Sequence, residues 1–533
     1  MQKDRAIQIG VTLTFSLVQK IGQVKRPREV CFFAKIVGIY EVGVSQDETG
    51  SSLMSISEKP SQRTAAYIFS NYGYLLVIAA FLFADFIPRF WQGDSLSYLM
   101  TGEDWIPPDR SWAFGFFANY IFRHTRGGSA FILMQVGIMA LLIATARVYF
   151  PYRRKLGIVY GAIAIVLALD PCLEIYTRFF MSDFLAFTFF FLALLALFRL
   201  MSESEDGNHS WFWIGCVVIS GMAAIWVRVA YAVIVEVAVL LTALIRMGRL
   251  SRRQWLALCL SALAPFLAVA SILAANRIVF ADRFPHELFV NRLSGVLTAA
   301  VFAPAVQKSD FDKVGIPITN AEFQRLDLKN YNKRSDHVWG TAHDDLHQFL
   351  RDKLGVKEGE GDTRAVGKAS SGLVRSAFLR NPFAVAKVYV YDLLEYATPR
   401  RWRVQGPNES GLTRPLPDYF VSFWNRYSAL KVDPEITRIR SPLVRIFEAT
   451  LYFYPFVLLL GAIAAAYLII TERSMPSAVV LTAGSVAVLA AAPLYSDYVL
   501  ARYVLGAIVN SYLLVGLAVQ TIVSRRYAHA SDR

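Results

Sequence analysis

The sequence of 533 residues is 55% hydrophobic and 18% charged, and its mean hydropathy is +0.40. Soluble domains carry about 25% charged residues, so this composition indicates an integral membrane protein. The formal net charge of +14 is not the footprint of a nucleic-acid-binding protein, because Lys and Arg fall mostly between apolar runs, which is typical of membrane topology.

The N-terminal segment and the cysteines carry little functional signal. Residues 1–66 lack the compact basic and apolar order of a signal peptide and are expected to form a cytoplasmic extension. The four cysteines include no C-x-x-C pair. Neither a disulfide framework nor a cysteine metal site is therefore predicted.

Apolar windows long enough for membrane-spanning helices recur along the chain, since about 20 apolar residues cross the hydrocarbon core. Ten are predicted, at 67–87, 129–150, 156–172, 179–200, 211–227, 229–247, 255–279, 446–470, 477–494 and 503–523. The expected fold is a mainly α-helical, polytopic membrane bundle. Its predicted parts are an N-terminal transmembrane region (67–279), an extracytoplasmic domain (280–445) and a C-terminal transmembrane region with a cytoplasmic tail (446–533).

Clusters of basic residues set the expected sidedness. Arg and Lys gather at 153–155, 246–253 and 525–526, and the positive-inside rule places all three clusters in the cytoplasm of a multi-pass inner-membrane protein. The loop 88–128 and the domain 280–445 then lie outside. The candidate chemistry is therefore expected on the extracytoplasmic face.

The sequence WQGDSLSY (Trp91–Tyr98) places one carboxylate, Asp94, directly after the first predicted span. A solvated loop residue is the simple interpretation, and Trp91 fits the aromatic belt found at membrane interfaces. The later turns carry ionisable residues too: YTRFFMSDF holds Arg178 and Asp183, and AAIWVRVAYAVI holds Arg228.

These segments together resemble the glycosyltransferase-C superfamily, in particular its polyprenyl-phosphate-sugar-dependent branch with protein mannosyltransferase-like (family 39) and aminoarabinose-transferase-like enzymes. YSDYVLARYVLGAIV (Tyr495–Val509) is similar to the start of that family's late span, and RNPFAVAKVYVYDLL (Arg380–Leu394) to its amphipathic helix. The first loop departs from many relatives, which carry paired acids where this chain has Asp94 and Ser95.

The resemblance implies specific roles. Asp94 would be the catalytic base of an inverting displacement, and Arg178, Arg228 and Arg502 would bind the donor phosphate, although each arginine could instead pair with an acid or snorkel. Asp183 could also simply cap its helix. The residues expected to bind substrate are Tyr98, Asp183, Asp497 and Tyr503.

The expected partners are the membrane, a polyprenyl-phosphate-linked sugar donor and a glycan, lipid or protein acceptor. No cofactor is predicted with certainty; a divalent metal ion remains open, and His343 and His347 have the spacing of a metal pair on a helix. Two alternatives stay open as well. A transporter or flippase would rely on charges within its spans, and an enzyme like an O-antigen ligase or polymerase would rely on its large outer loop.

Overall fold

The structure is a computed structural model. It describes residues 60–91, 94–99, 101, 112–125, 127–150, 157–202, 210–279, 296, 298–334, 337, 344–356, 364–472, 475–496 and 498–531. Pro60–Arg533 form one compact unit. Almost all of the predicted extension 1–66 lies outside the described residues, so its role stays a prediction.

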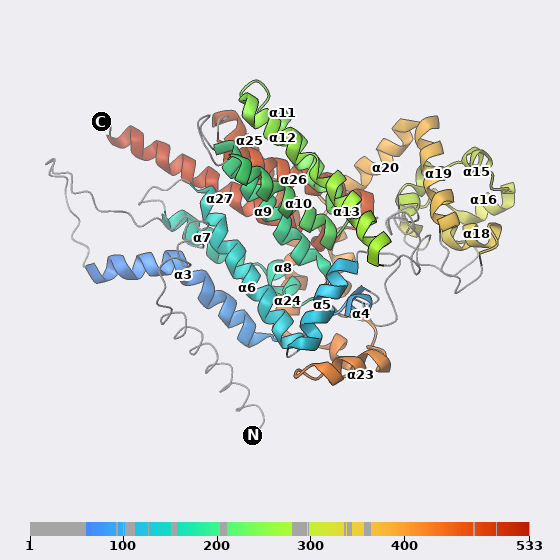
Figure 1. The fold of residues 1–533 in the computed structure, drawn as a ribbon, viewed down its shortest axis with the longest axis horizontal. Helices are drawn as coiled ribbons and strands as arrows, with labels where there is room; N and C mark the ends of the chain where they lie inside the picture. The colour runs from blue at the N-terminus through green and yellow to red at the C-terminus, as the bar shows by residue number, and fades with distance from the viewer. Residues whose placement is uncertain are drawn as a thin grey trace. The chain divides into compact units, whose positions relative to one another are not determined.

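Helices make up the regular structure throughout the described ranges, where the only extended contact is an isolated bridge between Arg89 and Phe179 (Figure 1). Their bounds in the first half are α3 (Pro60–Ala84), α4 (Asp94–Leu99), α5 (Trp112–His124), α6 (Gly128–Ala146), α7 (Gly157–Leu169), α8 (Pro171–Tyr176), α9 (Ser182–Ser202), α10 (Ser210–Val227), α11 (Tyr231–Ile245), α12 (Arg252–Ser261) and α13 (Ala264–Val279).

The second half continues with shorter helices before three long ones. Their bounds are α15 (Lys308–Val314), α16 (Asn320–Leu326), α18 (Leu346–Lys353), α19 (Arg364–Arg380), α20 (Pro382–Glu395), α21 (Pro399–Val404), α22 (Gly406–Glu409), α23 (Asp418–Tyr427), α24 (Pro442–Thr450), α25 (Tyr454–Thr471), α26 (Pro476–Tyr495) and α27 (Ala501–Ser531).

The predicted windows coincide with apolar helices. Among the described residues, six helical segments are long and apolar enough to cross a membrane, namely Gly128–Tyr149, Ser182–Ser202, Arg252–Ala275, Pro434–Thr471, Pro476–Tyr495 and Ala501–Arg526. Four shorter apolar helices occupy the other four windows. The chain is therefore a multi-pass helical membrane protein, as the sequence predicts, and the count of ten spans stays a prediction.

Two hydrophobic cores hold the described helices together. The first core lies within the apolar helices, where α9 packs on α10, α11 on α26, and α27 on both α25 and α26. The second core is formed by α15, α16, α18, α19 and part of α20 (Figure 1). Trp402 and Trp424, which the sequence assigns to the extracytoplasmic domain 280–445, are buried in the first core. The packing thus divides that predicted domain between the two cores.

A buried charge network fixes the chain after α3. The Arg89 guanidinium lies 3.0 Å from the Asp85 carboxylate and donates a 2.7 Å hydrogen bond to the Ser441 hydroxyl just before α24. Arg178 pairs with Glu174 at 2.8 Å and donates to the Asp85 carbonyl oxygen at 2.9 Å. These contacts join the segment that leads to α4 to both α8 and α24. They therefore hold the starting point of the WQGDSLSY segment.

Removing one partner of this network is expected to destabilise the protein. Arg89→Leu leaves the Asp85 carboxylate buried without its cation, which costs about 3–5 kcal/mol in comparable pairs. The double variant Asp85→Ala/Arg89→Leu removes both charges and is expected to melt at a higher temperature than Arg89→Leu alone. Thermal melting of the purified protein in detergent measures both. A double variant that melts no higher than the single one would contradict the charge-pair explanation.

Candidate active site

Asp94 begins the short helix α4, and its side chain remains 26% exposed. Its Oδ2 lies 3.7 Å from Nη1 of Arg502 at the start of α27. At this separation the two groups attract each other without forming a close hydrogen bond. The structure thus brings together two residues that are 408 positions apart, the predicted base and one predicted phosphate ligand.

Arg502 is buried beneath aromatic rings. Its guanidinium carbon lies 3.9 Å from the ring centroid of Trp91 and 4.9 Å from that of Tyr503. Contacts of this kind stabilise a cation by about 0.5–2 kcal/mol and restrict its orientation. Trp91 is therefore a site residue, which its sequence context did not distinguish from the interfacial aromatic belt.

Arg228 occupies the turn between α10 and α11 and pairs with Asp183 at the start of α9, at 2.7 Å. Its guanidinium carbon also lies 5.1 Å from the ring centroid of Tyr503, so this tyrosine contacts two arginines. Burial disfavours the charged form of Arg228, but Asp183, Asp94 and two neighbouring tyrosines together outweigh burial and raise the pKa of the guanidinium. Arg228 is thus a permanent cation that is 18% exposed.

Tyr98 connects α4 to the same helix start. Its hydroxyl shares a 3.0 Å hydrogen bond with that of Ser182, the residue before Asp183, and its buried ring packs edge-on against Phe114. Because little of the ring is accessible, Tyr98 serves to hold α4 in place. Ser182 was not singled out from the sequence.

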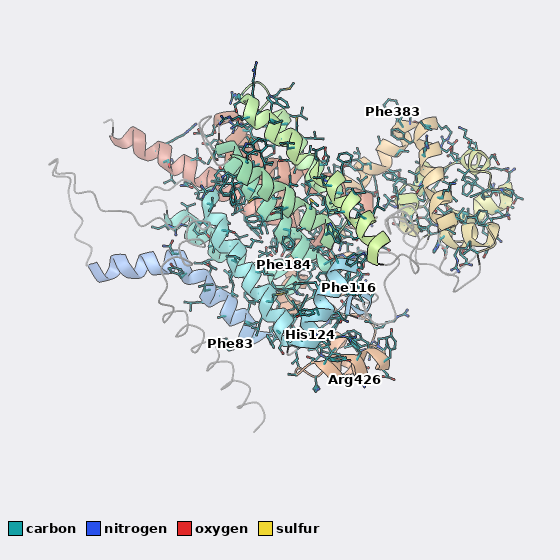
Figure 2. All side chains as sticks on the ribbon, viewed as in Figure 1. Phe83, Phe116, His124, Phe184, Phe383 and Arg426 are labelled. Atoms are coloured by element: carbon teal, nitrogen blue, oxygen red, sulfur yellow. The ribbon has the colours of Figure 1, made fainter. Side chains whose placement is uncertain are left out.

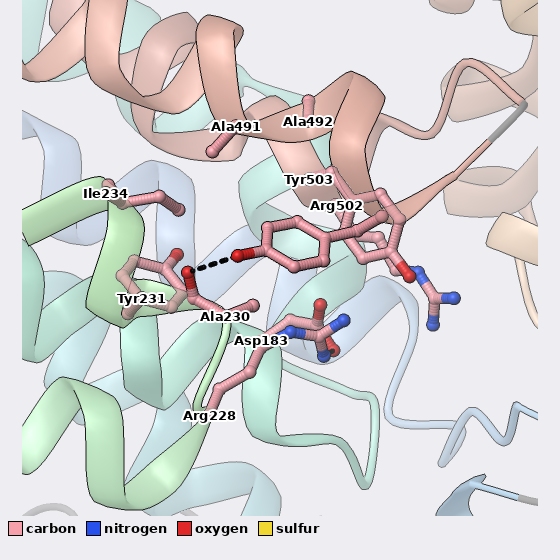
Figure 3. A pocket seen from close by; sticks show the side chains of 10 residues that line it. Asp183, Arg228, Ala230, Tyr231, Ile234, Ala491, Ala492, Arg502 and Tyr503 are labelled. Atoms are coloured by element: carbon pink, nitrogen blue, oxygen red, sulfur yellow. Dashed lines mark hydrogen bonds and ion pairs between the residues drawn. The ribbon is translucent and has the colours of Figure 1, made fainter. Parts of the chain in front are cut away.

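A pocket lies where these elements meet (Figure 3). Asp183, Arg228, Arg502 and Tyr503 form its polar side, and the space next to the lining atoms, including the part that is open to solvent, is about 300 Å³. The remaining lining residues, from α11, α26 and the turn before α11, are Ala230, Tyr231, Ile234, Ala491, Ala492 and Tyr495. Cations and apolar side chains therefore face the same space, while Asp94 adjoins it through Arg502.

One described candidate, Arg178, does not join this group. The Arg178 guanidinium is completely buried against Glu174 and Asp85, so it supports the chain after α3 instead of reaching the pocket. Asp497 and His343 lie outside the described residues. Within the described ranges, no three His, Cys, Asp or Glu side chains group in a way that could hold a metal ion.

Glu409 is a buried carboxylate that the sequence analysis did not single out. Its oxygens accept hydrogen bonds from the backbone N–H groups of Ala501 and Arg502, at 2.9 and 3.1 Å, and from the Tyr176 hydroxyl at 2.7 Å. Burial raises the pKa of Glu409, although these hydrogen bonds act in the opposite direction. Glu409 thus fixes the first turn of α27, which carries Arg502 and Tyr503.

These features define a multi-pass helical membrane protein with a pocket that is partly cationic and partly apolar, where the ends of α9, α10, α11, α26 and α27 meet. No family model matches the chain, and no curated protein matches it.

Solved structures of ArnT from Cupriavidus metallidurans are similar to the chain at 15% identity, with 86% of this chain and 78% of that chain covered. The TM-score is 0.35 for the form bound to undecaprenyl phosphate and 0.30 for the apo form.

Replacing Glu409 is expected to loosen the start of α27. In Glu409→Gln, one acceptor oxygen becomes an NH2 group, which faces a backbone N–H or the Tyr176 hydroxyl and leaves a buried donor unsatisfied, at a cost of about 1–3 kcal/mol. Tyr176→Phe keeps both backbone hydrogen bonds and is the matched control. Thermal melting in detergent is expected to show the larger loss for Glu409→Gln. Equal melting temperatures for the two variants would contradict this assignment.

Proposed function

We propose that the protein is a membrane glycosyltransferase of the glycosyltransferase-C type, which moves a sugar from a polyprenyl-phosphate donor to an acceptor hydroxyl. One observation supports this proposal above the others: Arg228 and Arg502, from distant parts of the chain, line one partly apolar pocket, and Asp94 lies 3.7 Å from Arg502 beside it. Transfer from a lipid phosphate needs a base, positive charge for the leaving phosphate and an apolar surface for the lipid.

Asp94 is the proposed base. Its exposed fraction leaves the carboxylate accessible to an incoming hydroxyl, and the cation of Arg502 lies 3.7 Å away. In the proposed step, Asp94 takes the acceptor proton as the acceptor oxygen bonds to the anomeric carbon. The bond from that carbon to the phosphate oxygen breaks with its electron pair, so the configuration inverts and polyprenyl phosphate leaves.

Arg228 and Arg502 are the proposed ligands of the leaving phosphate. Guanidinium groups match phosphate oxygens in a planar, bidentate geometry, and both groups contact the ring of Tyr503. Asp183 holds one of them by its 2.7 Å ion pair. Asp183 and Tyr503 thus orient the cations, which refines their predicted role in substrate binding.

The apolar wall of the pocket suits the first isoprene units of the donor. Ile234, Ala491 and Ala492 contribute aliphatic groups from two helices that belong to the apolar part of the chain. We place the site at the outer end of the spans of a cytoplasmic-membrane protein, following the distribution of basic clusters. We also propose that the protein belongs to the branch of this superfamily that resembles protein mannosyltransferases.

Asp94→Asn is expected to abolish transfer while leaving the fold intact, because the amide cannot accept a proton. A loss of about 10²–10⁴-fold is expected from removing a general base. Transfer of radiolabelled sugar from a panel of polyprenyl-phosphate donors to envelope extract measures it. Asp312→Asn, an exposed acid on α15, is the matched control, and thermal melting verifies folding.

Two outcomes of that experiment would contradict the proposal. If folded Asp94→Asn transfers sugar as fast as wild type, Asp94 is not the base, and an enzyme resembling a ligase becomes the better interpretation. If wild-type protein transfers sugar from no donor in the panel, transport assays with lipid-linked sugars take precedence.

Arg502→Lys tests the phosphate role. Lysine keeps the charge but loses the planar group that stacks on Trp91 and binds phosphate in a bidentate way. We expect a fall in kcat/KM for the donor of about 10²–10³-fold, as seen when a transition-state donor is removed. The surface variant Arg438→Lys is the control. An unchanged kcat/KM in Arg502→Lys would exclude Arg502 from the phosphate site.

A further inference from the structure

Helix α20 differs from an ordinary surface helix, because its acidic side chains are buried while several of its apolar side chains are exposed. Asp392 is 3% exposed and receives two hydrogen bonds from Arg334 Nη1, at 2.7 and 2.8 Å. Glu395 is also buried and pairs with Arg401 at 2.9 Å. Both charges are therefore compensated within the protein, as buried charges require.

The opposite face of α20 is exposed and apolar. It carries Phe383, Val390 and Leu394 at helical spacing, and Phe378 and Leu379 from the end of α19 adjoin it across Asn381 and Pro382. We call these five side chains the corner patch. Phe383 is 84% exposed, more than any other large hydrophobic residue that the structure describes, and Figure 2 shows it at the edge of these helices.

The exposure of the corner patch equals that of side chains on the membrane-spanning helices. Leu379 is 70% exposed, and so are Leu76 on α3 and Ile219 on α10, two apolar helices that occupy predicted spans. Soluble proteins seldom leave side chains of this kind uncovered in one contiguous group. The corner patch therefore has the character of a lipid-facing surface.

Helix α20 cannot itself cross the membrane. Its 14 residues extend about 21 Å, whereas the hydrocarbon core is about 30 Å thick. It nevertheless contacts a helix long enough to span the membrane, because the Tyr389 hydroxyl donates to the Ala490 carbonyl oxygen of α26 at 2.8 Å. Leu494, at the end of α26, also packs against the second core. Helix α20 thus lies against the C-terminal end of α26.

The charges around the corner patch are of one sign. Between Arg375 and Val404 the two carboxylates are those of Asp392 and Glu395, and both are buried. The same stretch exposes Arg375, Lys387, Arg400 and Arg403. Lys387 lies within the apolar stripe of α20, between Phe383 and Val390, and the three arginines lie beyond its ends along the chain. An apolar stripe that carries and adjoins cations suits the boundary between acyl chains and anionic headgroups, where each nearby cation contributes about 1 kcal/mol.

We propose that the corner patch is inserted into the interfacial layer of the bilayer, with anionic phospholipid headgroups against the flanking cations. The second core then stands on the membrane through α20 and the end of α19. This contact holds the second core against the bilayer beside the end of α26, independently of the reaction at the pocket.

Site-specific fluorescence in single-copy nanodiscs tests the proposal. The four native cysteines are replaced by alanine, and bimane is attached to Phe383→Cys or Leu394→Cys in the full chain. Quenching by doxyl-labelled lipid and by aqueous iodide is measured in nanodiscs of phosphatidylcholine and phosphatidylglycerol. Gln324→Cys on α16, an exposed polar position of the same core, is the matched control.

We expect severalfold stronger lipid quenching at positions 383 and 394 than at 324, and the reverse order for iodide. Iodide quenching at 383 equal to that at 324 would overturn the proposal, because the patch would face water. Shielding from both quenchers would also overturn it, because protein would cover the patch. If the cysteine-free chain does not fold, a photo-crosslinking amino acid at position 383 replaces bimane. A crosslink to phospholipid would support the proposal, and a crosslink to protein would overturn it.

The proposed contact between the cations and anionic headgroups is tested separately. Lys387→Gln/Arg400→Gln/Arg403→Gln is expected to remove the difference in lipid quenching between nanodiscs with and without phosphatidylglycerol. A difference that persists in this triple variant would overturn the role of these cations, while the quenching at 383 still tests insertion.

Discussion

Charges withdrawn from water need partners, and in a bundle of apolar helices this requirement decides how the connections are arranged. Arg89 is held by Asp85, Arg178 by Glu174 and Arg334 by Asp392, each with almost no exposure on either side. An isolated buried charge would cost several kcal/mol, so each pair acts as a constraint between segments. The segments that carry the candidate site are fixed by such pairs and by the buried carboxylate of Glu409.

The ion pairs of the protein divide by their accessibility. Arg178 and Glu174 are both fully buried, whereas Arg228 is 18% and Asp94 26% exposed. A fully buried pair holds structure, because no ligand can reach it. A pair that keeps an accessible side can exchange its partner for a substrate, and the arginines of both accessible pairs contact the ring of Tyr503. This contrast separates the frame of the molecule from the groups that we propose to act on a lipid phosphate.

The same balance explains the unusual face of α20. Its acidic side chains form ion pairs with Arg334 and Arg401, which leaves apolar side chains and cations on the surface. A helix of this kind is stable only where something other than water covers it. Its apolar spacing was visible in the sequence, but the direction of the apolar face depends on which charges find partners. The contact of Tyr389 with α26 joins this helix to a predicted span, which supports the proposal that its apolar face meets the bilayer.

The sequence by itself determined the helical membrane class and the positions of the apolar helices, because hydropathy is a property of local windows. The family resemblance of short segments only named Asp94, Arg178, Arg228 and Arg502 as candidates. Only the tertiary structure decided which ionisable residues meet. Arg178 pairs with Glu174 away from the pocket, Trp91 stacks on Arg502, and Glu409 holds the first turn of α27. The apolar face of α20 is exposed. These outcomes depend on pairs up to several hundred residues apart, which no local pattern encodes. The partner of a buried charge is fixed only when the whole bundle has packed.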